Sequence, residues 1–445
     1  NAGSIAINAG NVHLAANGHI RSDSDDSGSG GLISIAASNL ALRESAIAAN
    51  STGSGDGGTI QIKAGAIDLK DSTINSNAAN LGLGGTVTVE AKDLQMTDSF
   101  IAAFTFGQKD AGNVAVKADN LQISGGEITT STINSGDAGS IVIEAENLNV
   151  TNSGLILSST GGAGDAGSIR IDAGSMIVSG SGSVSSATYA GGNAGSVTVT
   201  ADSLDLRDQG AISTSTGGTG NAGRIVVDAD VLRVRKGGFI ASDTQFFDPV
   251  IGTQVGTGSA GSVQIQADSA IIQGQVSTST SGPGNAGLVD FEAVNLTVDA
   301  GIIASITAGT GNGGTISITT DSLNAINGGV VNADTFFSGQ GGDINVVANQ
   351  IKVDGANKAL GITSGIEASA FGRGDAGTIT VDTGVLEVTN GAFLRVETLG
   401  EGRAGDINID ATRIRVDGVN LDLGVATNGP ANDAPSVISV QTFGK

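Results

Sequence analysis

The chain has 445 residues, including 71 Gly, 4 Pro and no Cys, and its formal net charge is −23. This composition excludes collagen, which needs Gly at every third position and abundant Pro, and it excludes a disulfide framework or a thiolate metal site. The negative charge opposes nucleic acid and anionic membrane surfaces as partners. No apolar run reaches the length of about 18 residues that predicts a membrane-spanning helix.

A repeat that begins at Asn1-Ala2-Gly3 dominates the sequence. Its anchor Gly recurs fifteen times at spacings of 26 to 28 residues, apart from two longer steps of 38 and 35 residues. A fixed period in this range is typical of a solenoid, in which each repeat buries its apolar face against its neighbours. The anchors are Gly3, Gly31, Gly58, Gly85, Gly112, Gly139, Gly167, Gly195, Gly223, Gly261, Gly287, Gly314, Gly342, Gly377 and Gly405.

Within each repeat the expected elements follow in one order. Ala or Gly precedes every anchor, and Asn or Asp stands one position earlier in ten repeats, which predicts a turn. Ile or Val occupies the second and fourth positions after the anchor, with Phe291 the one exception, and the alternation with polar residues predicts a first strand.

A corner and two further strands complete the repeat. Ala stands six residues after the anchor in thirteen repeats, with Thr320 and Thr383 as the departures, and predicts a corner. Apolar residues nine and eleven after the anchor, such as Leu121 and Ile123, predict a second strand, and the region around Ile128 predicts a third. No segment has the period of 3.6 residues that a helix needs.

These elements predict an all-β fold, a single right-handed parallel β-helix over residues 1–445 with about fifteen coils of roughly 27 residues and three strands per coil. Right-handed winding follows from the handedness of parallel crossovers. The strand spacing gives a rod about 70 Å long. The two longer steps predict insertions near residues 243–258 and 354–363.

Both ends of the sequence lie in phase with the repeat. Phe443-Gly444-Lys445 joined to Asn1-Ala2-Gly3 gives nearly the phrase found at residues 106–112. We therefore expect either continuation into a longer chain or end-to-end self-association of rods.

Carboxylates recur in the turn that precedes the anchor. Asp110, Asp137 and Asp165 fall in consecutive coils, about 5 Å apart by the strand spacing. Together with nearby carbonyls, stacked carboxylates of this kind could hold Ca²⁺. The alternative is that turn N–H groups satisfy each carboxylate, since Asn replaces Asp elsewhere in the column. No other cofactor is predicted.

Seven of the twelve Phe residues follow the third strand, in the same sector of the coil. They predict either a ridge that contacts a partner or side chains that pack beneath the loops. The seven are Phe104, Phe106, Phe246, Phe247, Phe336, Phe337 and Phe371.

No nucleophile elbow, phosphate loop or zinc motif occurs in the sequence. Arg is sparse and scattered, and the repeats are nearly uniform, whereas β-helical enzymes need Asp, Arg or His clustered on one outer face. We predict no catalytic residue and no enzymatic activity.

The phrase Gly-Asn-Ala-Gly-Ser-Val-Thr-Val at residues 192–199, continued to Leu206 and repeated in related form at residues 220–234, resembles the repeat regions of filamentous-haemagglutinin-like proteins. These are adhesins exported by two-partner secretion in Gram-negative bacteria, and the phrasing is most similar to that of cyanobacterial members. The resemblance covers the whole chain. It implies a β-helical stalk displayed outside the cell or on its surface.

We therefore expect a structural rod segment of a secreted fibre or adhesin that gives reach and surface presentation. Its contacts would be with cell surfaces or polysaccharides. The alternative is a polysaccharide-binding or polysaccharide-cleaving β-helix protein of the cell surface.

Overall fold

The computed structural model describes residues 1–248, 252–359, 361–420 and 434–443. These residues contain strands and no helix, and hence no helix that could cross a membrane. The chain forms a right-handed parallel β-solenoid of about 14 turns with about 28 residues per turn. It divides into two compact units, Asn1–Gly223 and Arg224–Lys445. Both units use the same coil, and a single domain over residues 1–445 stays a prediction.

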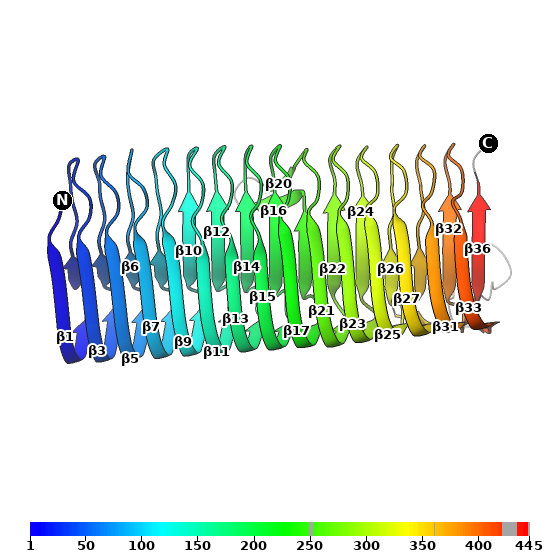
Figure 1. Ribbon diagram of the computed structural model, residues 1–445, viewed down its shortest axis with the longest axis horizontal. Helices are drawn as coiled ribbons and strands as arrows, with labels where there is room; N and C mark the ends of the chain where they lie inside the picture. Colours follow the sequence, from blue (N-terminus) through cyan, green and yellow to red (C-terminus); the bar gives the residue numbers. More distant parts are fainter. Residues whose placement is uncertain (249–251, 360, 421–433, 444–445) are drawn as a thin grey trace. The chain divides into compact units, whose positions relative to one another are not determined.

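In the first unit each coil contributes one long and one short strand, and the two kinds form separate parallel sheets (Figure 1). The long strands are β1 (Ser4–Leu14), β3 (Leu32–Arg43), β5 (Thr59–Lys70), β7 (Thr86–Thr97), β9 (Asn113–Ser124), β11 (Ile141–Thr151), β13 (Ile169–Val178) and β15 (Val197–Leu206). The short strands are β2 (His19–Arg21), β4 (Ala46–Ala48), β6 (Thr73–Asn75), β8 (Phe100–Ala102), β10 (Glu127–Thr132), β12 (Leu155–Thr160), β14 (Ser183–Thr188) and β16 (Ala211–Thr216).

The second unit repeats this arrangement of long and short strands. Its long strands are β17 (Arg224–Val234), β21 (Ser262–Ile272), β23 (Leu288–Asp299), β25 (Thr315–Ile326), β27 (Asp343–Asp354), β31 (Ile379–Thr389) and β33 (Ile407–Asp417). Its short strands are β18 (Phe239–Asp243), β22 (Gln275–Thr280), β24 (Ile302–Thr307), β26 (Val330–Asn332), β30 (Gly365–Glu367), β32 (Phe393–Thr398) and β36 (Val437–Thr442).

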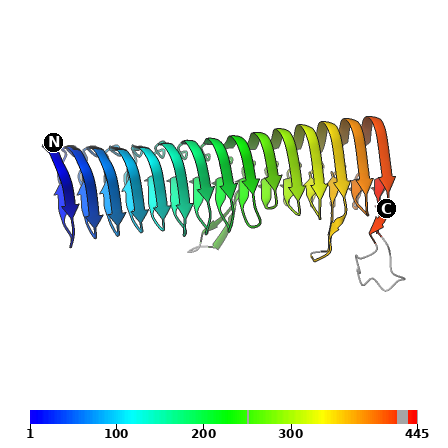
Figure 2. The same cartoon turned by 90° about the horizontal axis from the view of Figure 1, so that it is seen from below.

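Small antiparallel hairpins depart from the second unit's coils. The two predicted insertions contain β19 (Gln245–Asp248) with β20 (Gly252–Val255), and β28 (Ala356–Asn357) with β29 (Ile362–Thr363). A third pair joins β34 (Val419–Asn420) to β35 (Ala434–Pro435). The first two hairpins project beyond the strands of the coils in Figure 2. Because each insertion pairs with itself, the chain returns to the coil in the same register.

The structure differs from the sequence prediction in the number of strands per coil, because the expected first and second strands are one continuous strand. Strand β11 runs through Ala145, and its neighbour β13 keeps the same register on both sides of that residue. The strand bends at the small residue without losing its pairing. Each coil therefore contributes one strand to each of two parallel sheets, whereas the alternation of side chains predicted three strands per coil.

The buried columns are those that the sequence predicts. Ile141, Ile143, Leu148 and Val150 of one coil have no exposed surface, and Ile141 and Ile143 pair in register with Ile169 and Ile171 of the next coil. Like side chains thus stack from coil to coil, and each coil buries its apolar surface against two others.

The anchor Gly is required by close approach of neighbouring coils. A Cβ on Gly139 would lie 1.7 Å from the carbonyl oxygen of Gly112, the anchor of the preceding coil. None of the anchors has positive φ, so close approach and not a left-handed backbone conformation explains the Gly at this position. Most of the residues that do adopt positive φ lie thirteen or fourteen positions after an anchor, as at Asp98 (48°), Gly125 (67°) and Asn152 (51°). Asp, Asn and Gly are common at this second turn, a signal that the sequence prediction missed.

Substitutions at the column and at the anchor test this packing. We expect Ile141→Asp to lower the free energy of unfolding by roughly 3 to 5 kcal/mol, because it buries an unpaired charge. Gly139→Val should be similarly disruptive because a side chain there meets backbone atoms. Ile141→Val is the matched control and should cost about 1 kcal/mol. Thermal melts of Ile141→Asp or Gly139→Val that match the parent would contradict the assignment.

Candidate functional site

The three aspartates of the predicted calcium column lie in consecutive coils of the first unit, each facing the backbone of the next coil. Asp110 Oδ1 accepts a hydrogen bond from the N–H of Asp137 (3.0 Å), and Asp137 Oδ1 accepts one from the N–H of Asp165 (2.8 Å). Asp165 Oδ1 continues the ladder to the N–H of Asn193 (2.7 Å). Asn193 then does the same for Asn221 (2.9 Å). This position therefore works with either a carboxylate or an amide oxygen.

No group of three or more His, Asp or Glu side chains close enough to hold a metal ion occurs in the described ranges of the chain. Asp110, Asp137 and Asp165 already use one oxygen each in the ladder. Calcium binding at these residues stays a prediction.

Five of the seven predicted Phe residues have described side chains, and these gather at two places, one in each unit. In the first unit the rings of Phe104 and Phe106 are 6.3 Å apart and tilted by 49°. In the second unit Phe336 and Phe371 stack with their centroids 4.9 Å apart and their planes at 10°. Phe337 is 59% exposed beside them. Contact with a partner stays a prediction. Phe246 and Phe247 belong to β19, and their side chains lie outside the described residues.

The Phe336–Phe371 pair belongs to a longer row of apolar residues at the surface. Thr335, Ala370 and Thr398 bridge one another in consecutive coils, so the residues that follow them, Phe336, Phe371 and Leu399, occupy equivalent places. Leu399 is 44% exposed. The sequence prediction found the Phe residues and missed this Leu because it considered aromatic residues alone.

Buried hydroxyl groups form further columns that the sequence described only as a Ser/Thr-rich segment. Ser158 Oγ donates to the carbonyl oxygen of Gly139 (2.9 Å) and accepts from the N–H of Gly167 (2.9 Å). Thr132 and Thr160 contact each other through their hydroxyls at 2.9 Å. The Ser158 bonds satisfy backbone groups of two successive turns, and the Thr–Thr contact joins neighbouring coils.

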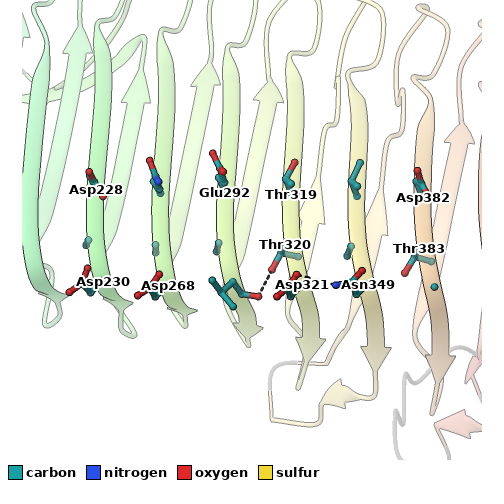
Figure 3. A pocket seen from close by; sticks show the side chains of 18 residues that line it. Asp228, Asp230, Asp268, Glu292, Thr319, Thr320, Asp321, Asn349, Asp382 and Thr383 are labelled. Carbon is teal, nitrogen blue, oxygen red and sulfur yellow. Dashed lines mark hydrogen bonds between the residues drawn. The ribbon is translucent and has the colours of Figure 1, made fainter.

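A groove of about 630 Å³ follows the bend of the long strands in the second unit. Its floor is the column of small residues at the bend, and its sides are the outward residues immediately before and after that column (Figure 3). Thr320, which replaces Ala in this column, donates to the carbonyl oxygen of Val294 (3.0 Å). The hydroxyl is thus satisfied within the wall of the groove.

Six carboxylates line this groove, and none of the described residues that line it is Lys, Arg or His. All six are exposed. Sequence reasoning missed them because each is an ordinary outward residue of its own strand, and only the coil stacking brings them together. The six are Asp228, Asp230, Asp268, Glu292, Asp321 and Asp382.

Two carboxylates of the first unit have a basic partner at the same bend. Lys63 Nζ lies 2.5 Å from Glu90 Oε1, and Lys117 Nζ lies 2.6 Å from Glu144 Oε2. The two residues of each pair belong to consecutive coils. The Glu144 carboxylate raises the pKa of Lys117, and Lys117 lowers the pKa of Glu144. No such basic partner is among the described residues that line the groove of the second unit.

Comparisons with protein-family models, with curated proteins and with solved structures found no match to this chain.

The uncompensated charge gives a prediction about salt. Asp230 and Asp268 occupy equivalent places in consecutive coils, between paired residues on either side. Because like charges directly opposite destabilise a sheet, we expect Asp268→Asn to raise the free energy of unfolding by about 0.2 to 1 kcal/mol at low salt. The gain should vanish at about 1 M salt, where the Debye length is about 3 Å.

Glu90→Gln is the matched control, because it removes a carboxylate that has a Lys partner. It should leave stability unchanged or lower it slightly at low salt. Urea unfolding at low and high salt measures both variants. A loss of stability in Asp268→Asn at low salt would contradict the repulsion.

Proposed function

We propose that this chain is a structural rod segment of a secreted extracellular fibre or adhesin, whose task is reach and surface presentation. The observation that carries the proposal is the constant register of the coils within each unit. The long strands of neighbouring coils pair at equivalent positions, as β9 does with β11 and β25 with β27. A stack held by nearest-neighbour contacts of this kind is suited to serve as a spacer.

Export in an unfolded state fits the same architecture. A solenoid can nucleate at one coil and propagate to the next, without the long-range contacts that a globular core requires. The resemblance to filamentous-haemagglutinin-like repeats supports two-partner secretion as the route and the outside of a Gram-negative-type cell as the destination.

Two outer surfaces of the second unit are the ones we propose for presentation. The acidic groove favours cationic groups on a partner, and its charge opposes lateral association of like rods unless cations screen it. The row of Phe336, Phe371 and Leu399 offers apolar contact area, with Phe336 and Leu399 exposed and Phe371 half-buried. Presentation of either surface to a partner requires no catalytic activity.

The acidic groove also favours the second candidate, a polysaccharide-binding or polysaccharide-cleaving protein of the cell surface. Glycoside hydrolysis uses a pair of carboxylates on either side of the bond that breaks. In this groove the carboxylates form two outward rows flanking the floor (Figure 3). We rank the structural rod first because the rows follow from coil repetition and need no reacting substrate.

Electron microscopy and surface labelling of the native cells test the proposal. We expect an antibody to label intact cells from outside, and the purified material to form continuous filaments whose axial repeat matches the strand spacing of about 4.8 Å. Short isolated particles with a defined globular partner would instead favour a surface-anchored binding module. Release of reducing sugars from uronate polymers, abolished by Asp268→Asn, would overturn the assignment as a non-enzyme.

A further inference from the structure

A second ladder of Asp and Asn side chains runs beside the short strands. In the first unit Asn50 Oδ1 accepts a hydrogen bond from the N–H of Asn77 (2.8 Å), and Asn77 Oδ1 accepts one from the N–H of Phe104 (2.9 Å). In the second unit Asp334 Oδ1 accepts one from the N–H of Ser369 (3.0 Å). A neutral amide therefore performs the same bond in one unit that a carboxyl group performs in the other.

Asp334 differs from the other described members of the ladder in having a second carboxyl group beside it. It is only 4% exposed, and Glu367 of the next coil is 7% exposed. Ser369 joins the two, because its N–H donates to Asp334 and its hydroxyl donates to Glu367 Oε1 (2.8 Å). Two carboxyl groups on adjacent coils are thus buried together.

One cation serves this cluster. Arg395 donates to both oxygens of Glu367 at 2.9 Å, and its Nε lies 3.4 Å from Glu397 Oε1. The guanidinium also lies over the ring of Phe393, with its carbon 4.5 Å from the ring centroid. Three carboxyl groups therefore share one guanidinium. Its hydrogen bonds go to Glu367, and the described contacts of Asp334 include no direct ion pair.

The remaining contacts of Asp334 are neutral. Asn332 Nδ2 donates to Asp334 Oδ2 (2.9 Å), while Asn332 Oδ1 is buried without a hydrogen-bond partner. If the side-chain amide of Asn332 is flipped by 180°, its Oδ1 takes the place of Nδ2 beside Asp334. It can then accept a hydrogen bond from a protonated Asp334 Oδ2. On the opposite side of Asp334 the preceding coil contributes Ile306 near this position, so the charged neighbours all come from the β30 and β32 coils.

We propose that Asp334, Glu367, Glu397 and Arg395 form a proton-dependent lock between the coils of β26, β30 and β32, closed when Asp334 carries a proton. In the closed state the neutral carboxyl adds no charge beside Glu367, and the ladder bond to Ser369 holds the two coils in register. Loss of the proton buries a third negative charge beside a single guanidinium. The lock then loosens these coils as the pH rises.

The direction of the pH dependence follows from the burial. Removal from water, and then the nearby Glu367, raise the pKa of Asp334 from 3.8 to about 7, against the opposing hydrogen bonds and Arg395. A carboxyl group whose pKa is higher in the folded than in the unfolded chain stabilises the fold fully only below its unfolded pKa. This contribution is lost as the pH rises through the folded value. Partial burial likewise raises the pKa of Glu397.

Hydrogen–deuterium exchange of the intact chain tests the lock. The amides of residues 365–370 and 393–398 are followed at about pH 5.5 and about pH 8.5, with correction for the intrinsic dependence of exchange on pH. We expect their protection to fall roughly tenfold or more across this range in the wild type. Asp334→Asn should abolish the fall and leave these amides better protected at about pH 8.5, since Asn already serves the ladder at Asn50 and Asn77.

Two further variants separate the lock from a general effect of charge. Asp375→Asn removes an exposed carboxylate that accepts the same kind of bond, from the N–H of Arg403 (2.7 Å), and should leave the fall unchanged. Glu367→Gln removes the neighbouring negative charge, so the midpoint of the fall should move to lower pH. Equal protection of the wild type at both pH values, or an undiminished fall in Asp334→Asn, would overturn the proposal.

Discussion

Hydrogen bonding between consecutive coils in a fixed parallel register is the constraint on which the rest of each unit depends. Because side chains alternate across a strand, a slip of one residue would carry every apolar column from the interior to the surface. The anchor Gly allows the approach that the register requires, since the carbonyl oxygen of Gly112 occupies the space of a Cβ on Gly139. The insertion that contains β28 and β29 pairs with itself and leaves the register of the flanking long strands intact.

Polar side chains also connect consecutive coils. Asp137 and Asn193 accept hydrogen bonds from the N–H of the next coil, and Ser158 bonds the anchors of two successive coils. Such bonds tolerate exchange of Asp for Asn when water screens the charge. Where neighbouring coils exclude water, as at Asp334, only a carboxyl group can gain or lose a proton. Exchange for Asn there is expected to change how the stability of these coils depends on pH. One repeated bond therefore has different consequences along the chain.

The columns of Ile, Val and Leu and the corner at Ala could be predicted from the sequence because each depends only on spacing from the anchor. The joining of two strands into one could not be predicted in this way. The alternation of side chains is interrupted at the bend, whereas the backbone pairing continues in the same register on both sides of Ala145. The carboxylates of the acidic groove were missed for a different reason. Asp230 and Asp268 are distant in sequence and unremarkable singly, and they meet only because a longer step returns the chain to the same place. The burial of Asp334 likewise comes from the neighbouring coils, which local sequence does not reveal.

The contact between successive anchors also determines how a gene for such a chain can change in length. Deleting or duplicating one whole repeat leaves every remaining Gly facing the carbonyl of another Gly, as Gly167 faces Gly139 and Gly195 faces Gly167. Gain or loss of part of a repeat would instead set a residue with a side chain against that carbonyl. Unequal recombination between repeats is therefore tolerated in steps of a complete coil. Related genes should differ by whole repeats, with other length changes confined to the projecting hairpins.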